Sequence, residues 1–480
     1  MEGIFQSYSE SDRQIIEKAF TLAQKAHQGQ NRLTGEPYIS HPLAVAQYLA
    51  GLKLDVSTIA AALLHDTIED TLVTDEDIKK EFGPTIAFLV QGATKLKNIE
   101  YSPTNILKKS HEEHLDTLKK MLFAMAQDLR VILIKLADRL HNMETLSVHG
   151  PEDQKRIATD TLEIYAPIAS RLGMGELKGQ LEDLAFPYVL PTEYKWLKKK
   201  VKDRYSNVAQ YIGRIKPIIE RHLVNAGINV ISIDTRAKRL YSLYQKLLTK
   251  DMDLSKIHDI VAMRIIVPDI KSCYEALGAL HAHYKPFPGL IKDYITMPKP
   301  NGYRSLHTTI FCERGKVVEI QIRTPEMHEH NEKGIAAHWA YTEGGKRNIQ
   351  AKSEDLKWIN QLKDFLKDAK SSESFSDLKI DFFKNRIFVL TPKGDVEDLP
   401  EGATPIDFAY AIHTDLGHAL RGARVNGKMV PIDYNLKNGD VVEIVKGKEL
   451  KPSRDWLNVV KTTEARRRIR GWFLLAQKGK

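Results

Sequence analysis

The stretch HDTIED (His65–Asp70) places one imidazole and three carboxylates within six residues. It directly follows IAAALL (Ile59–Leu64), an apolar run typical of the buried part of a helix, and Ser57 is a candidate N-cap for that helix. If the helix continues, residues four apart share one face. His65 then lies beside Glu69, and Asp66 lies beside Asp70. Carboxylates this close repel one another unless they face water or hold a cation. Because the cluster follows an apolar helix, we expect it to lie in a cleft and not in open water. A bound metal ion would then offset the repulsion among the carboxylates.

Two further segments supply matching side chains. RVILIKLADRLHNM (Arg130–Met143) is another apolar helix, with Asp138 and Asn142 four residues apart. His41 precedes a proline, which indicates a helix start. Each of these residues alone is more often a capped or solvated side chain. Together they form a mixed nitrogen and oxygen set that suits Mn²⁺, Fe²⁺ or Zn²⁺. The set is His41, His65, Asp66 and Asp138.

The first part of the chain resembles a known family. The His-Asp pair is similar to that of HD phosphohydrolases. More narrowly, HDTIED, GEPYISHP (Gly35–Pro42) and KLADRLHNM (Lys135–Met143) resemble the hydrolase domain of Rel/SpoT homologues, the bacterial stringent-response enzymes that make and destroy (p)ppGpp. The resemblance implies an all-α HD hydrolase domain over residues 1–195 that releases pyrophosphate from (p)ppGpp and leaves GDP or GTP.

The resemblance also implies roles for particular residues. One Mn²⁺ would bind the four-residue set and lower the pKa of a bound water. Glu69 and Asp70 would orient or deprotonate that water. In the family, a lysine usually follows the residue that corresponds to Arg32, but this chain has Leu33 there. The change weakens the expected contacts with the base or phosphates of the nucleotide. The implied nucleotide-binding residues are Arg32, Asn142 and Thr145.

Composition sets outer limits on the protein. A chain of 480 residues is long enough for two to four domains, each with its own core. The start of the sequence lacks a basic-then-apolar signal peptide, and no apolar stretch approaches the roughly 20 residues that span a bilayer. Cys273 and Cys312 are too few for a disulfide scaffold and are expected in the core. We therefore expect a cytoplasmic protein with no membrane partner.

The net charge of +9 is concentrated near the end of the sequence. Lys446–Lys480 contains eleven Lys and Arg against three acids, an excess of eight positive charges. Arg466-Arg467-Arg468, with Arg470, offers contacts to RNA phosphate. A solvated helix face is an equally good interpretation.

After Pro191 the pattern changes. Lys195 to about Ala226 predicts a long charged connector helix. Short β-branched runs then alternate with helical stretches such as Ile270–His283, which predicts an α/β or α+β domain. The predicted strands are Asn229–Ile233, Val261–Val267 and Lys316–Ile322.

Polar residues of this second region suit a polyphosphate and a metal ion. The cations Arg236, Lys238 and Lys246 and the hydroxyl of Ser242 line an expected helix start, although solvated basic residues are as common. Asp259 begins a strand and Glu319 lies inside one, where a carboxylate is costly without a partner such as Mg²⁺. The turn before Tyr303 presents a ring able to stack on a base.

Four motifs in this region resemble the synthetase domain of the same family. They are RAKRLYSLYQK (Arg236–Lys246), HDIVAMR (His258–Arg264), PKPNGYRSLHTT (Pro298–Thr309) and EIQIRT (Glu319–Thr324). The resemblance implies a nucleotidyltransferase-like α+β domain over residues 196–345 that transfers the β,γ-pyrophosphate of ATP to the 3′-hydroxyl of GDP or GTP. Mg²⁺ would bind Asp259 and Glu319, and Glu319 would also activate the hydroxyl. The implied ATP-binding residues are Arg236, Lys238, Ser242, Lys246 and Arg264, and the implied GDP- or GTP-binding residues are Lys299, Asn301, Tyr303 and His307.

Several positions depart from the family pattern. Bifunctional members tend to have Arg-x-Lys-Asp where this chain has Leu290-Ile291-Lys292-Asp293. Gln245 replaces a residue that is often basic, and Arg304 one that is often Gln. Loss of a cation near a polyphosphate costs on the order of 1 to 3 kcal/mol of binding. We expect both activities, with hydrolysis the more secure. The alternatives are a hydrolase with a weak or inactive synthetase domain, and a protein that mainly binds tRNA or the ribosome.

The remaining sequence predicts a linker at 346–384 and a small β-rich domain at 385–447. TPIDFAYAIHTDLGH (Thr404–His418) and VNGKMVPIDYNLKNGDVVEI (Val425–Ile444) resemble the TGS domain that follows the synthetase in long family members. This implies a β-grasp-like fold, with the ribosome and uncharged tRNA as partners and His413 at the tRNA 3′ end. We expect residues 448–480 to begin a longer regulatory region. We also expect that nucleotide bound in one active site disfavours the competent state of the other active site, and that the connector helix transmits this effect.

Overall fold

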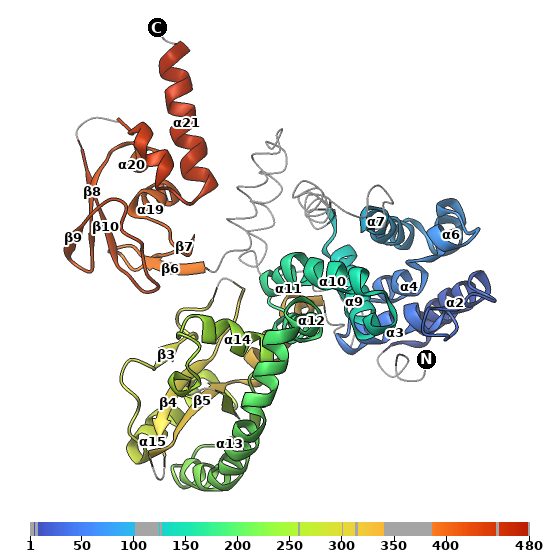
Figure 1. The fold of residues 1–480 in the computed structure, drawn as a ribbon, viewed down its shortest axis with the longest axis horizontal. Coiled ribbons are helices and arrows are strands. Elements are labelled where there is room, and N and C mark those ends of the chain that lie inside the picture. Colours follow the sequence, from blue (N-terminus) through green and yellow to red (C-terminus); the bar gives the residue numbers. More distant parts are fainter. Residues whose placement is uncertain are drawn as a thin grey trace. The chain divides into compact units, whose positions relative to one another are not determined.

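The computed structural model describes residues 4, 8–100, 124, 127–257, 260–299, 301–312, 315–339, 386–447 and 451–478. The chain divides into two compact units, whose described parts end at residue 339 and begin at residue 386 (Figure 1). Two predictions lie outside the described residues: the metal ligand Asp259 and the linker at 346–384.

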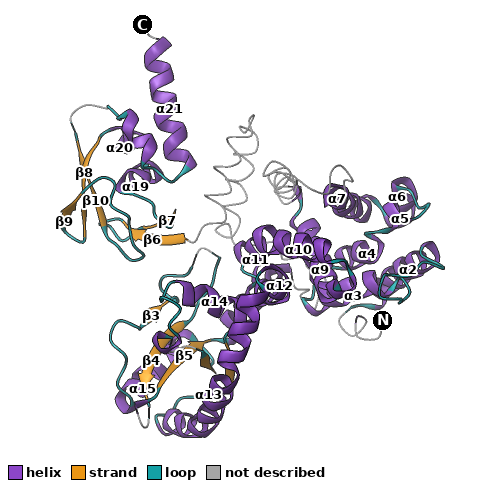
Figure 2. Cartoon of the chain, viewed as in Figure 1, coloured by secondary structure: helices purple, strands orange, loops and turns teal. Residues whose placement is uncertain are grey.

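The first 190 residues of the first unit are helical where they are described (Figure 2). This confirms the prediction of an all-α domain. The elements are α2 (Glu10–Ala26), α3 (Ser40–Gly51), α4 (Val56–Leu64), α5 (Thr67–Asp70), α6 (Asp75–Phe82), α7 (Pro84–Glu100), α9 (Leu129–Glu144), the 3₁₀ turn η1 (Leu146–Val148), α10 (Pro151–Asp160), the π turn η2 (Thr161–Tyr165), α11 (Ala166–Arg171) and α12 (Gly175–Val189).

Helix α4 is the centre of this domain, because every residue from Ile59 to Leu64 is fully buried. Its N-cap is Asp55, whose carboxylate accepts the amide of Thr58, so the prediction of Ser57 as the cap was wrong. Asp55 also pairs with Arg130 of α9, which fixes its carboxylate at the helix start. The helix does not continue through residue 70: α4 ends at Leu64, and a separate helix, α5, follows.

The helix stops because side chains take over its last carbonyl groups. Thr67 Oγ1 donates to the carbonyl of Leu64 at 2.7 Å, and His65 Nδ1 lies 2.7 Å from the carbonyl of Ala62. His65 and Asp66 therefore form a turn between α4 and α5. This turn buries both residues and leaves Asp70 exposed.

Helix α13 (Pro191–Asn225) leads into a mixed five-stranded sheet, which confirms the α+β prediction. The helix begins four residues before the predicted Lys195, because Pro191 suits its first turn. The sheet has the order β1-β2-β5-β4-β3, with β2 and β5 parallel and the other pairs antiparallel. Its elements are β1 (Ser232–Ala237), α14 (Leu240–Leu248), η3 (Leu254–Lys256), β2 (Val261–Ile266), α15 (Ile270–His283), β3 (Lys292–Asp293), β4 (Leu306–Phe311), β5 (Val317–Arg323), α16 (Pro325–Lys333) and η5 (Gly334–Trp339).

Two strand predictions need correction. The first strand begins at Ser232 rather than Asn229 and runs to Ala237, so Arg236 lies on a strand and not at a helix start. The strand Leu306–Phe311 was not predicted, since its alternation of His, Thr and Ile is too short a pattern to stand out. The other predicted strands match β2 and β5 within one residue.

Alternation along the strands gives this sheet two different faces. One face carries apolar residues such as Met263 and Ile320, which are fully buried in a core with residues of α13 and α15. Cys273 belongs to the same core, and both cysteines are buried and free, as expected. The opposite face carries the charged and polar residues of β1, β2, β4 and β5.

The second unit is small and rich in β-structure, as predicted. Strands β10-β8-β9 form one sheet and β6-β7 a hairpin, joined by a parallel bridge between Leu390 and Val441. Its elements are β6 (Arg386–Leu390), β7 (Val396–Pro400), α19 (Pro405–Ile412), α20 (Thr414–His418), β8 (Leu420–Val425), β9 (Lys428–Val430), β10 (Val442–Lys446), η6 (Arg454–Asn458) and α21 (Thr463–Lys478).

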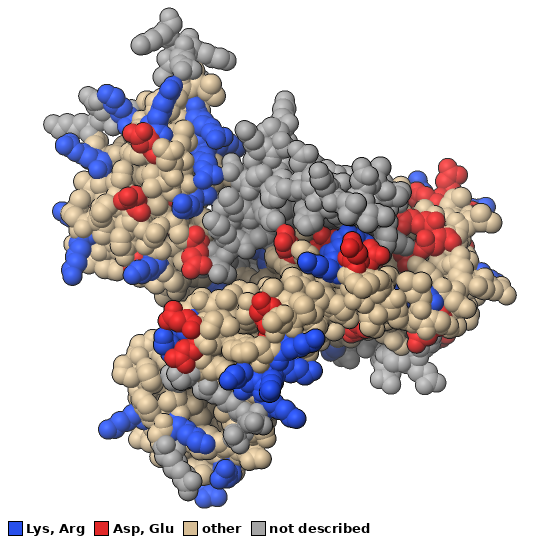
Figure 3. Space-filling model, in the orientation of Figure 1, with Lys and Arg blue, Asp and Glu red and all other residues tan. Residues whose placement is uncertain are grey.

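The basic tail belongs to this unit. Ala465 and Ile469 of α21 are buried in a core with residues of α19, so the core crosses the boundary expected at residue 447. Asp407 fixes the connection by accepting the amides of Lys461 and Thr462. Figure 3 shows Lys and Arg side chains gathered over α21. None of the helices in the described ranges has both the length and the apolar character needed to cross a membrane.

Candidate functional site

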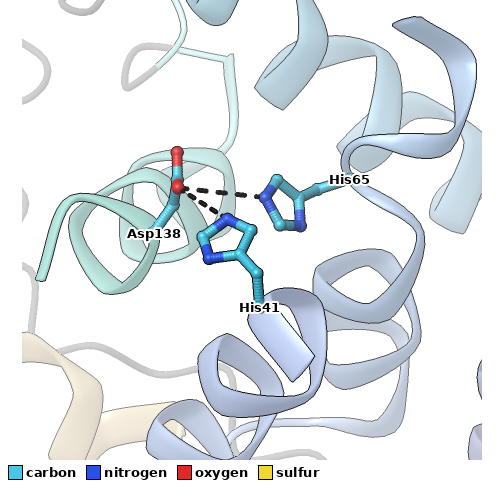
Figure 4. A group of neighbouring side chains, drawn as sticks. All are labelled: His41, His65 and Asp138. Atoms are coloured by element: carbon cyan, nitrogen blue, oxygen red, sulfur yellow. Dashed lines mark ion pairs between the residues drawn. The ribbon is translucent and has the colours of Figure 1, made fainter. Parts of the chain in front are cut away.

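Two imidazoles and one carboxylate meet at the centre of the helical domain (Figure 4). His41 comes from the start of α3, His65 from the end of α4 and Asp138 from the middle of α9. Their candidate ligand atoms all lie within 4.8 Å of one another, and all three residues are buried. Asp138 Oδ1 is 3.1 Å from His41 Nε2 and 4.0 Å from His65 Nε2.

The hydrogen bonds of His65 prepare it to bind a cation. Its Nδ1 faces the carbonyl of Ala62, which only accepts, so Nδ1 carries the proton and Nε2 holds a lone pair. This buried Nε2 has no hydrogen-bond partner among the described residues, although it lies 3.4 Å from Asp66 Oδ1. A metal-binding imidazole is commonly fixed by a carbonyl on its other nitrogen in this way. The residues present therefore fit a divalent ion.

The carboxylate of Asp138 is ionised and fixed. Lys135 Nζ lies 2.7 Å from Oδ2, and Asn142 Nδ2 donates to Oδ1 at 2.7 Å. Burial acts to raise the pKa of Asp138, but the Lys135 ammonium and the hydrogen bond from His41 hold that pKa well below its usual range. Lys135 is 1% exposed, so this pair is a buried salt bridge next to the metal centre.

The other three predicted residues of the centre lie at different depths. Asp66 is buried beside both imidazoles, with Oδ2 3.6 Å from His41 Nε2. Tyr38 OH lies 2.9 Å from Asp66 Oδ2 and 2.7 Å from Asp70 Oδ2, so it connects the buried carboxylate to the exposed one. Glu69 is half-buried. Neither Glu69 nor Asp70 lines the cavity described next.

A cavity of about 240 Å³ opens beside the centre. Arg32 reaches across it, and its guanidinium contacts Asn142 Oδ1 at 3.1 Å and Thr145 Oγ1 at 3.4 Å. The structure thus brings the three predicted nucleotide-binding residues together. Leu33 also lines the cavity and is 72% exposed. The lining residues are Asn31, Arg32, Leu33, Thr34, Tyr38, His41, Asp66, Asp138, Arg139, Asn142, Thr145, Val148, His149 and Ile157.

The sequence interpretation missed three residues of this site: Tyr38, Lys135 and His141. His141 Nδ1 lies 2.8 Å from His41 Nδ1 and 3.0 Å from an Arg32 nitrogen. Burial, followed by the charges of His41 and Arg32, lowers the pKa of His141 to about 4, so His141 is neutral and accepts at Nδ1. A signal was present, because each missed residue lies three positions from a predicted ligand on the same helix or helix start.

The second candidate site lies on the polar face of the five-stranded sheet. The strand register places Arg236 opposite Ala262 and Ala262 opposite Glu319, while Gln321 lies opposite both Arg264 and His307. Directly opposite residues point to the same side of a sheet. Arg236, Arg264, His307, Glu319 and Arg323 therefore share one face, although they come from four strands.

A chain of hydrogen bonds crosses this face. His307 Nδ1 donates to Glu319 Oε1 at 2.9 Å, so His307 Nε2 accepts from Tyr303 OH at 2.8 Å. Arg323 Nη2 in turn donates to Tyr303 OH at 3.1 Å. Burial lowers the pKa of His307, which agrees with a neutral ring. Glu319 of β5 thus has a protein partner on the neighbouring strand β4, in addition to any metal ion.

The predicted ATP residues are distributed over two elements. Arg236 and Arg264 lie on β1 and β2, and both are within ion-pair distance of Glu332. Lys238 follows β1 directly, and Ser242 and Lys246 lie four residues apart on one side of α14. Ser242 Oγ is 3.5 Å from Glu182 of α12.

The predicted guanine-nucleotide residues surround Tyr303. Lys299 Nζ lies over the rings of Tyr294 and Tyr303, 4.7 and 5.0 Å from their centroids. Asn301 Nδ2 donates to the carbonyl of Ser170 and its Oδ1 accepts the amide of Tyr303, so its amide group fixes the turn. Lys299 is exposed as a whole residue, but its Nζ is desolvated against the two rings; this desolvation, followed by the charges of Lys292 and Lys178, lowers the pKa of Lys299 to about 8.

The variant motif at Leu290–Asp293 has a structural role at its last residue. Asp293 accepts from Tyr274 OH and from the amides of Ile295 and Thr296, at 2.8 to 3.0 Å. The carboxylate therefore closes the turn after β3. Leu290 is half-buried just before that strand.

His413 is well exposed in the second unit. It ends α19 and caps α20, where its Nδ1 accepts the amide of Asp415 at 3.2 Å. Two thirds of its side chain is open to solvent. His413 is thus a helix-terminal histidine, and its ring stays accessible to a partner.

The fold and these sites define a class of multidomain protein, with a buried His/Asp cluster able to hold a metal ion in a helical domain, a cationic polar face on a mixed sheet, and a small β-rich domain. The sequence matches the HD domain at residues 19–175, the region found in RelA/SpoT proteins at 235–346 and the TGS domain at 387–446. The chain therefore belongs to the RelA/SpoT family.

Curated relatives match almost the whole chain. The GTP pyrophosphokinase of Myxococcus xanthus is 48% identical over 99% of this chain and 62% of its own length. The bifunctional (p)ppGpp synthase/hydrolase SpoT of Escherichia coli is 45% identical over 98% of this chain and 66% of its own length. The guanosine-3′,5′-bis(diphosphate) 3′-pyrophosphohydrolase of Aquifex aeolicus is 46% identical over 95% of this chain and 64% of its own length. This chain thus spans less than two thirds of the length of these relatives.

Solved structures match over single domains. A metazoan SpoT orthologue that hydrolyses ppGpp aligns with 32% of this chain and 86% of its own at 27% identity, with a TM-score of 0.24. Small alarmone synthetase 1 from Bacillus subtilis, bound to pppGpp, aligns with 36% of this chain and 94% of its own at 19% identity, with a TM-score of 0.25. The family assignment rests on the sequence relatives.

Proposed function

We propose that this protein is a bifunctional (p)ppGpp enzyme. One site hydrolyses (p)ppGpp to GDP or GTP and pyrophosphate, and the other transfers pyrophosphate from ATP to the 3′-hydroxyl of GDP or GTP. The observation that carries the proposal is the lone pair of buried His65 Nε2, held toward His41 and Asp138 beside a cavity. The names of the relatives include both directions of this chemistry.

In the hydrolase site, His41, His65, Asp66 and Asp138 would hold Mn²⁺, which suits a mixed imidazole and carboxylate set. A divalent ion bound there would lower the pKa of a water molecule beside the 3′-pyrophosphate. Arg32 would pair with the nucleotide phosphates, together with Asn142 and Thr145, which it already contacts.

The water in this site must also lose a proton. Glu69 and Asp70 are the candidate acceptors, since Tyr38 connects Asp70 to Asp66 by hydrogen bonds through one hydroxyl group. Tyr38 would therefore keep the exposed carboxylate aligned with the buried one.

In the synthetase site, the guanidiniums of Arg236 and Arg264 would bind the ATP phosphates, with Lys238, Ser242 and Lys246 along α14. Glu319 would take the proton of the attacking 3′-hydroxyl, and His307 would orient it through the 2.9 Å hydrogen bond. Asp259 and Glu319 would hold Mg²⁺, which would supply positive charge to neutralise the phosphates. Tyr303, Lys299 and Asn301 would receive the guanine nucleotide.

The second unit would bind RNA. The exposed ring of His413 would meet the 3′ end of uncharged tRNA, and the exposed Arg467, Arg468 and Arg470 of α21 would contact phosphate on the ribosome or tRNA. Arg467 and Arg468 both lie near Glu464, which offsets part of their charge. Such partners place the protein in the cytoplasm.

The direct experiment is product analysis of the purified chain in two reactions: ppGpp with Mn²⁺, and ATP plus GDP with Mg²⁺. We expect pyrophosphate and GDP from the first and ppGpp from the second. His65→Asn is expected to stop only the first and Glu319→Gln only the second. Product in neither reaction would contradict the proposal and favour a protein that mainly binds tRNA or the ribosome, tested by salt-dependent tRNA binding with and without residues 385–480. Hydrolysis alone would leave a hydrolase with an inactive synthetase domain.

Leu33 gives a gain-of-function prediction. It lies exposed on the cavity wall next to Arg32, so Leu33→Lys adds a cation close to the bound phosphates. We expect the KM for ppGpp to fall about two- to fivefold with kcat nearly unchanged, because a partly exposed ion pair contributes ~0.5–1 kcal/mol. Leu33→Met is the matched control, since it keeps the length without the charge. A KM that is the same in both variants would contradict a phosphate contact at this position.

Lys299 gives a pH prediction. Since its folded pKa is about 8, the cost of burying its charge is fully present below pH 8 and is relieved as the pH rises toward the ordinary lysine value. Binding of an anionic nucleotide needs the charged form. We therefore expect the KM for GDP to rise above pH 8 by up to about tenfold per pH unit, one proton being taken up on binding.

Lys299→Arg is the control for this prediction, because arginine stays charged over the whole range. The variant is expected to show a flat KM between about pH 7 and about pH 9.5, well below the pKa of arginine. The same slope in wild type and variant would assign the titration to another group.

A further inference from the structure

Three guanidiniums meet on the polar face of the sheet, and we call Arg236, Arg264 and Arg323 the arginine cluster. They come from three neighbouring strands in the order β1-β2-β5. The side chain of Arg323 is 0% exposed, that of Arg264 is 11% and that of Arg236 is 37%. The cluster therefore runs from the protein interior to the surface.

A single carboxylate oxygen lies at the centre of this cluster. Glu332 on α16 places Oε1 3.1 Å from Arg264 Nη2 and 3.9 Å from both Arg236 Nη1 and Arg323 Nη1. His328, one turn earlier on the same helix, has its Nδ1 3.9 Å from the same oxygen. Helix α16 thus inserts one negative charge among three positive ones.

Glu332 does not neutralise all the charges of the arginine cluster, and it does not supply acceptors for all its hydrogen-bond donors. Asp234, opposite Arg264 in the strand register, is exposed and forms no ion pair that the described contacts include. The buried Nε and Nη1 of Arg323 and the buried Nε of Arg264 have no hydrogen-bond partner among the described residues. Buried guanidinium donors without acceptors are costly. A group with several negatively charged oxygens would satisfy the cluster better than one carboxylate does.

We propose that Glu332 is an internal counter-ion that stands in the place of an ATP phosphate, and that ATP takes over its arginine partners on binding. This inference rests on the proposed binding of ATP at this face. Glu332 keeps the three guanidiniums together when no nucleotide is bound, and its charge then repels the incoming phosphate. It therefore lowers the affinity for ATP and raises the ATP concentration at which synthesis begins.

The test is ATP binding to the full chain by calorimetry, with wild type, Glu332→Gln and Glu329→Gln. The Glu332→Gln substitution keeps the shape of the side chain but removes the charge. We expect ATP to bind about five- to twentyfold more tightly to Glu332→Gln, the size of effect that one nearby like charge has in a partly buried site. Glu329 lies on the same helix, more exposed and paired with Lys333, so its variant is expected to bind ATP as wild type does. Inorganic tripolyphosphate is expected to show the same order of affinities.

The outcomes separate this inference from the proposed function. Unchanged or weaker ATP binding by Glu332→Gln would overturn the counter-ion role, and weaker binding would make Glu332 an organiser of the cluster. Arg264→Gln tests the site itself: it is expected to weaken ATP binding at least tenfold, and unchanged binding would remove the ATP site from this face. If Glu332→Gln does not fold, Glu332→Asp, which keeps the charge but withdraws it from the arginines, is expected to bind ATP more tightly than wild type.

Discussion

Replacing His65 with Asn is expected to lower ppGpp hydrolysis by at least about 10³-fold, because several kcal/mol of metal-dependent stabilisation are lost. The asparagine amide retains a donor to the carbonyl of Ala62, which His65 Nδ1 now contacts at 2.7 Å, but it removes Nε2. The measurement is ppGpp turnover with Mn²⁺, together with Mn²⁺ affinity by calorimetry. We expect stoichiometric binding of one Mn²⁺ in wild type and a large loss of affinity in the variant.

Pyrophosphate transfer by the same preparation is the internal control for folding, since that reaction uses the sheet domain. The smaller side chain leaves a cavity, which we expect to cost about 1–3 kcal/mol in the free energy of unfolding. Full hydrolysis with unaltered Mn²⁺ affinity would show that His65 is a structural histidine rather than a ligand.

Replacing Glu319 with Gln is expected to lower ppGpp synthesis by at least about 10²-fold, the usual contribution of a general base. The glutamine carbonyl still accepts from His307 Nδ1, so the hydrogen-bond chain through Tyr303 to Arg323 stays in place. The loss would then be chemical rather than structural. The measurement is the initial rate with saturating ATP and GDP, with hydrolysis of ppGpp as the second readout.

Glu329→Gln is the surface control for this variant, because Glu329 is exposed and pairs only with Lys333 among the described ion pairs. We expect it to retain both activities. If Glu319→Gln kept synthesis within tenfold of wild type, the base would have to be another group. Whether Leu290, in place of the arginine usual in the family, lowers synthesis is tested separately by measuring the synthesis rate of Leu290→Arg.

The structure also identifies an element that contacts both active domains. Helix α12 packs against α9, which carries Asp138, and against α14, which carries Ser242 and Lys246. Asp183 of α12 accepts the amide of Tyr241 at 2.9 Å and so caps the start of α14. The connector helix α13 was expected to link the two sites, and α12 has the more direct contacts with both.

Local pattern was enough to predict most of the helices. The apolar run before His65, the apolar helix at Arg130–Met143 and the long helix predicted from Lys195 each carry their own signals of periodicity and breakers. The same patterns, with the family resemblance, placed His41, His65 and Asp138 in one site. They meet because buried polar side chains need polar partners: His41 lies at the start of α3, His65 at the end of α4 and Asp138 in the middle of α9.

Other features were decided only by tertiary structure. The end of α4 at Leu64 depends on the side chains of His65 and Thr67, which compete with the backbone for its carbonyls. The position of Lys135 beside Asp138, and of His141 beside His41, depends on how α3 and α9 pack.

The polar face of the sheet shows the same division most clearly. Sequence alone identified Arg236, Arg264 and Glu319 as separate motif residues, but strand order and register decide which of them are neighbours. Glu332 carried no signal in its own segment, because a glutamate on a charged helix is usually solvated. Its place among three arginines results from the packing of α16 against the sheet, since a long-range contact of this kind is set by the whole fold and not by the residues around it.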